Sequence, residues 1–513
     1  MIRKILFISS LTIFLAGCRQ ASKSDKTVSA DESFKALSEE FIDGYLSWRP
    51  HYGVYLGFHQ YDGKMTDLSK ESVEGEYLRL KSFEQKFRQI DTAGLSPKMK
   101  LDRTILLSMI GNELFNFEDL QVFKYNPMVY FFPSGAFGEI GMDLSIYLNH
   151  NFAPLEERFK SIMSVLKEVP KTVSDAESNL ADSLPGLYIS TTIEILESSA
   201  DFLKNDLVLV MKEINNDTIS ESFNELNESA VKSLLAFRDF LKKEKLTKAT
   251  DKYAMGIKNF EKMLLCEDIM IDPEKLLQIG LKELEKEQEE FKSTAKLINP
   301  DISPVEVFEQ LQHDHPTADR LIESSAANIE AIRQFVKDKN LITIPSEVRA
   351  KVKEMPKYLR SAFAIMDIPG PFETVATDAN YFITPVDPQW TPKQKEEWLG
   401  LFNYYTSDII SIHEAYPGHY VNFLHLNSSN ATKIEKVYMD YQFAEGWAHY
   451  SEQMMIEEEF GNSGNPVEAS KYKLAQLDES LARVCRYCVS LKMHCFGMSL
   501  DEAVKFFMDN SYM

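Results

Sequence analysis

The chain has 513 residues, of which 44% are hydrophobic, so it can form either one large enzyme or two or three smaller domains. Its 78 acidic residues outnumber its 56 basic residues, which gives a net charge of −22 at pH 7. This negative charge argues against nucleic acid as a partner and against electrostatic binding to anionic lipid.

Residues 1–18, MIRKILFISSLTIFLAGC, are typical of an export signal peptide. Two basic residues near the start precede about ten mostly apolar residues, a run too short to span a membrane stably. The closing Leu-Ala-Gly-Cys resembles the cleavage box of bacterial lipoproteins, which implies that Cys18 becomes the lipidated first residue of the mature protein. The alternative is an ordinary cleaved signal with an incidental cysteine.

Residues 19–31 are polar and predict a flexible tether between the membrane and the body of the protein. The lipoprotein signal implies an exported bacterial protein, anchored by lipid in the cell envelope. We expect it on the periplasmic face of a membrane, with the outer membrane favoured.

We predict that residues 32–513 form a single large domain that is mainly helical. A division of this domain into two lobes is the alternative arrangement. Helix starts are indicated by Asp272-Pro273 and by capping boxes that begin at Ser303, Thr391 and Ser499. Apolar residues at helical spacing follow each start. No Pro/Gly/Ser-rich linker after residue 32 marks a domain boundary.

The clearest exception to the helical pattern is NYFITPVDPQW, residues 380–390. Its β-prone run ends at Pro385 and Pro388, and prolines at the end of a short strand are typical of a sheet edge. We therefore predict a short β edge element near residues 380–386, and such an edge can pair with an extended peptide. The alternative is a connector between helices.

Cys485 and Cys488 form a C-x-x-C motif, which in an exported protein is compatible with a disulfide or half of a metal site. The surrounding residues 481–496 are helical in character and contain no Gly or Pro that would form a metal-binding turn. We therefore favour the interpretation that both cysteines are small packing residues.

Half of the ten histidines fall in one C-terminal stretch: His413, His419, His425, His449 and His494. The apolar spacing of the helix that starts after Thr391 continues to His413, so His413 is expected to face the core. An inward histidine is more often a satisfied core residue than a metal ligand. The adjacent Glu414 and a second polar cluster favour the interpretation that His413 is a metal ligand.

That second cluster is formed by Glu445, His449 and Glu452, which are spaced i, i+4 and i+7 on one helical face. Apolar neighbours indicate that part of this face is buried, and a buried carboxylate is costly unless it is paired or bound to metal. The alternative is a solvated face of an amphipathic helix. Gly446 is expected to let another helix approach closely.

A catalytic zinc ion needs three protein ligands, an open position for water and a nearby carboxylate base. His413, His419 and Glu445 can supply the ligands, and Glu414 can act as the base. Residues six apart on a regular helix are separated by about 120° and about 9 Å, so an unbroken helix cannot bring both histidines to one ion.

Pro417 and Gly418 lie between the two histidines and resolve this difficulty. Proline lacks the N–H that would bond the carbonyl of His413, and its ring collides with that carbonyl. Glycine adds the backbone freedom needed to turn His419 back. We therefore predict a break in the helix between His413 and His419.

The sequence resembles the bacterial family known as domain of unknown function 885, which is related to zincin-type metallopeptidases. The matching parts are YFITPVDPQW (381–390), ISIHEAYPGHYVNF (410–423), FAEGWAHYSEQMM (443–455) and the pattern of Arg483, Arg486, Tyr487 and His494. Weaker similarity begins near residues 52–69, so the likeness spans almost the whole mature chain. HExxPGH together with EGWA is specific to the family.

The resemblance implies a mainly helical, zincin-like fold with zinc held by the same three ligands and Glu414 as catalytic base. It adds His494 as an active-site neighbour, and His494 or His449 can donate a second hydrogen bond to the oxyanion. Family members commonly carry Gln in place of Asn422. They usually continue beyond a segment like residues 500–513, which implies a C-terminus shortened relative to the family.

These features predict a lipid-anchored zinc metallopeptidase that hydrolyses peptides. His/His/Glu ligation favours zinc over other divalent ions. An alternative from another class is a non-catalytic envelope lipoprotein that binds peptides or a partner protein and has a structural or disabled metal site. A third is a hydrolase of another amide or ester, because the motif specifies activated water better than the bond attacked.

Overall fold

The computed structural model describes residues 29–131, 142–357, 360 and 363–512. The predicted signal peptide, Cys18 and the tether up to residue 28 lie outside the described residues. Residues 30 and 31 of the predicted tether already belong to helix α1, because the Ser29 side chain accepts a hydrogen bond from the Glu32 N–H in a capping box. Within the described ranges, no helix is both long enough and apolar enough to cross a membrane.

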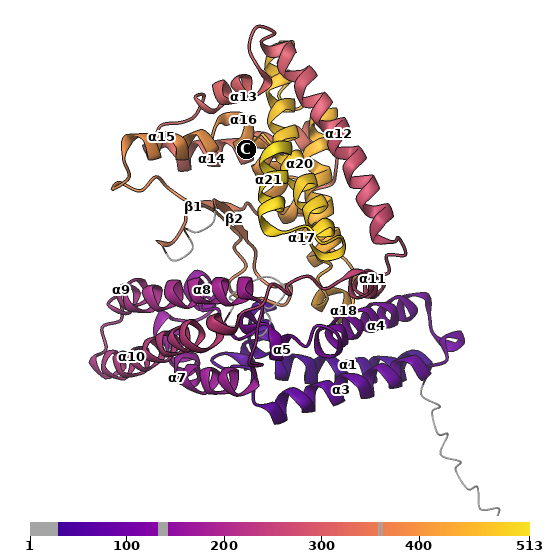
Figure 1. The fold of residues 1–513 in the computed structure, drawn as a ribbon, viewed down its shortest axis with the longest axis vertical. Helices are drawn as coiled ribbons and strands as arrows, with labels where there is room; N and C mark the ends of the chain where they lie inside the picture. The colour runs from indigo at the N-terminus through magenta and orange to yellow at the C-terminus, as the bar shows by residue number, and fades with distance from the viewer. Residues whose placement is uncertain (1–28, 132–141, 358–359, 361–362, 513) are drawn as a thin grey trace, which may run out of the picture.

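The protein is mainly helical, as predicted, and its buried apolar residues form two large clusters. One cluster is built from residues between 34 and 241 together with Ile434 and Val437, and the other from residues between 284 and 485. In Figure 1 the first is the indigo-to-magenta layer and the second is the pink-to-yellow group of helices above it. We call these the N-terminal lobe and the C-terminal lobe.

The helices of the N-terminal lobe are α1 (Ala30–Trp48), α2 (Pro50–Tyr55), α3 (Lys70–Gln89), α4 (Pro97–Glu118), α5 (Val122–Tyr125), α6 (Ser145–Asn149), α7 (Leu155–Asn179), α8 (Gly186–Lys204), α9 (Asp206–Met211) and α10 (Asp217–Phe240). Helix α11 (Ile257–Cys266) follows between the lobes (Figure 1). The remaining helices are α12 (Pro273–Ile298), α13 (Pro304–Gln312), α14 (Leu321–Asp338), α15 (Pro392–Leu401), α16 (Tyr404–Glu414), α17 (His419–Ser428), α18 (Lys433–Val437), α19 (Tyr441–Glu457), α20 (Pro466–Cys495) and α21 (Leu500–Asn510).

The helix starts predicted from capping residues are confirmed for α12, α13, α15 and α21. The prediction that one helix runs from Thr391 to His413 was wrong, because α15 ends at Leu401 and α16 begins at Tyr404. Between them, the Asn403 side chain accepts a hydrogen bond from the Thr406 N–H at 3.0 Å and caps the new helix. His413 still faces the core and is 7% exposed.

The C-terminal lobe contains a small sheet in the order β1-β3-β2, formed by β1 (Lys351–Glu354), β2 (Ala364–Asp367) and β3 (Asn380–Ile383). The predicted strand is therefore present as β3, but its predicted place at the edge was wrong. Strand β1 pairs with it in parallel on one side and β2 pairs antiparallel on the other. Pro385 and Pro388 follow the last paired residue, so they remove no hydrogen bond from the sheet.

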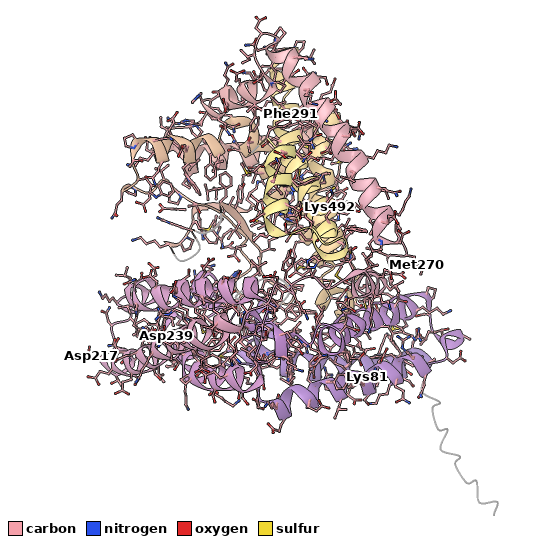
Figure 2. The ribbon with its side chains drawn as sticks, in the orientation of Figure 1. Lys81, Asp217, Asp239, Met270, Phe291 and Lys492 are labelled. Atoms are coloured by element: carbon pink, nitrogen blue, oxygen red, sulfur yellow. The ribbon has the colours of Figure 1, made fainter. Side chains whose placement is uncertain are left out.

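Helix α20 runs along α12 and carries the C-x-x-C motif. Cys485 and Cys488 are fully buried free thiols, which confirms the prediction that they pack in the core. The two helices approach closely at Gly280, where a Cβ atom would lie 2.9 Å from the sulfur of Cys488. Phe291 of α12, labelled in Figure 2, is also fully buried. This packing fixes the position of α20, and Arg483 of α20 contributes to the candidate site.

Two histidine–carboxylate pairs join the N-terminal lobe to the segment that contains β2. Nε2 of His59 lies 2.8 Å from an oxygen of Glu373, and Nε2 of His150 lies 2.9 Å from an oxygen of Asp367. The backbone is joined as well, because the Phe372 N–H donates to the Leu56 carbonyl at 2.9 Å. These contacts hold β2 against the N-terminal lobe.

Candidate metal centre

The two histidines of the HExxPGH motif lie on either side of a break between helices. Helix α16 ends at Glu414 and α17 begins at His419, which confirms the predicted interruption. The imidazole rings of His413 and His419 are perpendicular, with centroids 4.8 Å apart. The broken helix therefore brings together two side chains that a regular helix would separate.

Gly418 makes this turn possible because the chain passes directly over the end of α16. The Gly418 N–H donates to the Ile412 carbonyl at 3.0 Å. A Cβ atom on Gly418 would lie 1.7 Å from the carbonyl oxygen of His413. No side chain fits there without moving the backbone, so the motif requires glycine at this position.

Glu445 completes the group from α19, whose first turn is capped by Asp440. Its carboxylate oxygens lie 3.5 Å from Nε2 of His413 and 3.7 Å from Nε2 of His419. One ligand atom from each of the three residues lies within 4.8 Å of the other two. Around Gly446, the next residue, no described atom from outside its own stretch of helix lies within 4 Å of where a Cβ would stand, so the expected close helix contact there was wrong.

The three side chains form a donor set that could hold a metal ion such as zinc. Two ligands bound to zinc at about 2.0–2.1 Å in tetrahedral geometry lie about 3.3 Å apart. Two different oxygens of Glu445 lie at 3.5 and 3.7 Å from the two histidine nitrogens, close to this value, and the ligand atoms of the whole group lie within 4.8 Å of one another. Two imidazoles and one carboxylate also form a ligand set used by zinc hydrolases.

Glu452 orients His413 from behind. It is fully buried, and one of its oxygens lies 2.6 Å from Nδ1 of His413. Arg483 of α20 contacts both Glu452 oxygens, at 3.1 and 3.2 Å. Glu452 engages Nδ1 of His413, which leaves Nε2 directed toward Glu445. In metalloproteins a histidine ligand commonly has such a carboxylate partner on its other ring nitrogen.

The electrostatics of the two histidines differ. Burial lowers the pKa of His413, but the hydrogen bonds with Glu445 and Glu452 outweigh burial and raise this pKa to about 9. Burial and the charge of His413 lower the pKa of His419 to about 4. Burial would raise the pKa of Glu452, but its bond to His413 and the charge of Arg483 hold it at about 2. Without metal, His413 and Glu452 therefore form a charged pair beside a neutral His419.

Glu414 lies next to the group and is held by strand β2. One of its carboxylate oxygens accepts a hydrogen bond from the Met366 N–H at 3.2 Å. Burial raises the pKa of Glu414 to about 7. A carboxylate with such a pKa suits proton transfer near neutral pH.

One edge of β2 pairs with β3, and the opposite, unpaired edge faces Glu414. The Phe363 carbonyl accepts a hydrogen bond from the N–H of Thr384, the residue after β3. The backbone N–H and carbonyl of residue 363 therefore point toward β3. Backbone groups alternate in direction along a strand, so those of Ala364 and Met366 point the other way. The free edge of β2 therefore lies beside Glu414.

The other two histidines proposed for catalysis lie outside the ligand group. Nδ1 of His449 is 3.7 Å from Glu452 and its Nε2 is 3.5 Å from the Ser480 hydroxyl. His494 accepts at Nδ1 from the Met255 N–H at 3.4 Å. It lies eleven residues after Arg483, or about 16 Å further along α20. The structure does not bring His494 to the three ligands.

Sequence reasoning gave no role to Glu452, Arg483 or Met366 in the site. The spacing of Glu452 from Glu445 placed it on the same helical face, which is a usable signal. Arg483 was part of the family pattern, but nothing in its spacing pointed to Glu452. The Met366 contact spans 48 residues and comes from the backbone, so no side-chain pattern could indicate it.

Together, the fold and the site define a bilobed helical protein with a His/His/Glu group and an adjacent half-buried carboxylate. The chain belongs to the family of bacterial proteins of unknown function called DUF885, whose family model matches residues 50–513. No functionally curated protein matches it.

Two solved structures share this fold. One is described as a candidate lipoprotein of unknown function from Shewanella oneidensis; it is 20% identical, has a TM-score of 0.75, and the match covers 94% of this chain and 87% of that one. The other is described as a candidate lipoprotein from Colwellia psychrerythraea, with 14% identity, a TM-score of 0.77, and coverage of 95% and 87%.

Proposed function

We propose that this protein is a zinc-dependent peptidase of the zincin type. The observation that carries the proposal is the contact between Glu414 and the free edge of β2, directly beside the His413, His419 and Glu445 group. An edge strand binds extended peptides through main-chain hydrogen bonds. A peptide bound there would pass a carboxylate base and three candidate zinc ligands.

His413, His419 and Glu445 would hold the zinc ion. A zinc ion in this position supplies a Lewis acid that polarises a carbonyl and makes a water molecule more acidic. Glu414 takes a proton from the attacking water and gives it to the leaving amine. Glu452 and Arg483 keep His413 in the orientation that ligation needs.

We extend the proposal to the location of the enzyme. Cys18 would carry the lipid that anchors it in the cell envelope, on the periplasmic face of the outer membrane. The lipoprotein-type ending of residues 1–18 and the descriptions of the two structural neighbours support a lipid anchor in the envelope, and the choice of the outer membrane is part of the proposal. His449 and His494 are not assigned catalytic roles in this proposal.

Digestion of a mixed peptide library by the purified protein, read by mass spectrometry, tests the proposed function. We expect new cleavage products in the presence of zinc, no products after treatment with a chelator, and recovery of the products when zinc is added back. A protein that cleaves no peptide with zinc bound would instead match a non-catalytic binding lipoprotein. Cleavage that survives complete removal of metal would contradict the zinc mechanism.

A further inference from the structure

Tyr55, at the end of α2 in the N-terminal lobe, has an unusual environment. Its neighbours Tyr52, Val54 and Leu56 are buried, whereas Tyr55 is 39% exposed. Its ring stacks on Tyr52, with centroids 6.2 Å apart. Its hydroxyl makes no hydrogen bond to any part of the chain that the structure describes. The ring is therefore held in place while its donor group stays available.

Tyr55 lies close to both elements that carry the candidate site. Its hydroxyl lies within electrostatic range of the Tyr441 phenol and the Asp367 carboxylate. Asp367 follows Met366, the residue that bonds Glu414, on strand β2. Tyr441 precedes Glu445 by four residues on α19, so the two share a helical face and lie about 6 Å apart. Asp367 belongs to the strand that bonds Glu414 and Tyr441 to the helix that carries Glu445, so Tyr55 lies on the side of the N-terminal lobe that meets both elements.

The position of Tyr55 relative to Glu414 is fixed through the backbone. A Cβ atom on Gly370 would lie 2.2 Å from the Tyr55 carbonyl oxygen, so the end of α2 rests directly on the segment after β2. The bond from the Phe372 N–H to the Leu56 carbonyl secures the same contact. The same segment continues back to β2, which bonds Glu414.

The hydroxyl of Tyr55 is suited to donate a hydrogen bond. Although the side chain as a whole is 39% exposed, the protein around the hydroxyl partly excludes water, which raises the pKa of Tyr55, and the nearby acidic groups Tyr441, Asp367 and Asp143 raise it further. The phenol therefore keeps its proton at neutral and alkaline pH. A neutral phenol can donate to a carbonyl oxygen, the acceptor that a peptide offers at every residue.

We propose that Tyr55 is a substrate-contacting residue of the peptidase, donating a hydrogen bond to a carbonyl oxygen of the peptide bound beside β2. This inference rests on the proposed function and deepens it, because it makes the active site a composite of both lobes. The N-terminal lobe would then bind substrate as well as support the fold.

A comparison of Tyr55→Phe with Tyr450→Phe tests this inference on a peptide that the wild-type protein cleaves. The first change removes the hydroxyl and keeps the ring that stacks on Tyr52. Tyr450 is a matched control, because it is an exposed tyrosine on α19 that lies about 140° around the helix from Glu445. We expect Tyr55→Phe to lower kcat/KM about tenfold, the loss of one hydrogen bond in the bound complex. Tyr450→Phe should match the wild type.

Zinc content and the melting temperature of both variants complete the test. We expect both quantities to equal those of the wild type in Tyr55→Phe. An unchanged kcat/KM would overturn this inference and leave the proposed function standing. A fall in kcat/KM accompanied by loss of zinc or of thermal stability would show a structural role and would also overturn it. A zinc-loaded wild type that cleaves no peptide would overturn both.

Discussion

Glu414→Gln is expected to lower peptide turnover by about 10²–10⁴-fold, the usual contribution of a general base. Glutamine has nearly the same shape as glutamate, and its side-chain oxygen can still accept from the Met366 N–H. It cannot take a proton from water at neutral pH. Zinc content should stay at one ion per chain, because Glu414 is not one of the three ligands. Turnover of the library-derived peptide and elemental analysis measure the two quantities.

Glu457→Gln provides the matched control for this experiment. Glu457 is an exposed carboxylate at the end of α19, where it accepts a hydrogen bond from Gln453. The same chemical change there should leave turnover at the wild-type level. Full activity in Glu414→Gln would remove Glu414 as the base and with it the proposed mechanism.

Gly418→Ala should strongly weaken zinc binding at the site. The added methyl carbon would lie 1.7 Å from the His413 carbonyl oxygen and 2.5 Å from that of Ile412, both of which are backbone atoms. The turn between α16 and α17 must open to relieve this clash, which moves His419 away from His413. Loss of one ligand should weaken zinc binding by at least about 100-fold. Competition with a chromogenic chelator measures this affinity.

Gly446→Ala is the control for adding a methyl group next to the site. Gly446 directly follows the candidate ligand Glu445, but no described atom beyond its own stretch of helix lies within 4 Å of its Cβ position. Alanine also favours a helix by up to about 1 kcal/mol over glycine. We expect this variant to bind zinc like the wild type. Wild-type zinc affinity in Gly418→Ala would show that the turn is not what unites the two histidines.

The convergence of the candidate ligands could be predicted from residue types and spacing. The six-residue separation of His413 and His419 demanded a broken helix, and Pro417 with Gly418 indicated where the break lies. The break between α16 and α17 is the corresponding feature of the structure. Local chemistry was sufficient here because the constraint involves residues close together in the chain.

Features that depend on distant parts of the chain could not be predicted in the same way. The β-prone run at 380–383 indicated a strand, but its neighbours β1 and β2 carry weaker signals, so its central place in the sheet was missed. The free edge belongs to β2, whose contact with Glu414 comes from a backbone N–H. Burial of Glu452 behind His413 requires α20 to supply Arg483, which is a tertiary property.

Anomalous scattering from crystals of the zinc-loaded protein, recorded on both sides of the zinc absorption edge, tests the metal centre most directly. We expect one strong peak about 2.0–2.1 Å from Nε2 of His413, Nε2 of His419 and a carboxylate oxygen of Glu445. A zinc-loaded crystal with no peak among these three side chains, or with its strongest peak elsewhere, would contradict the proposed metal centre.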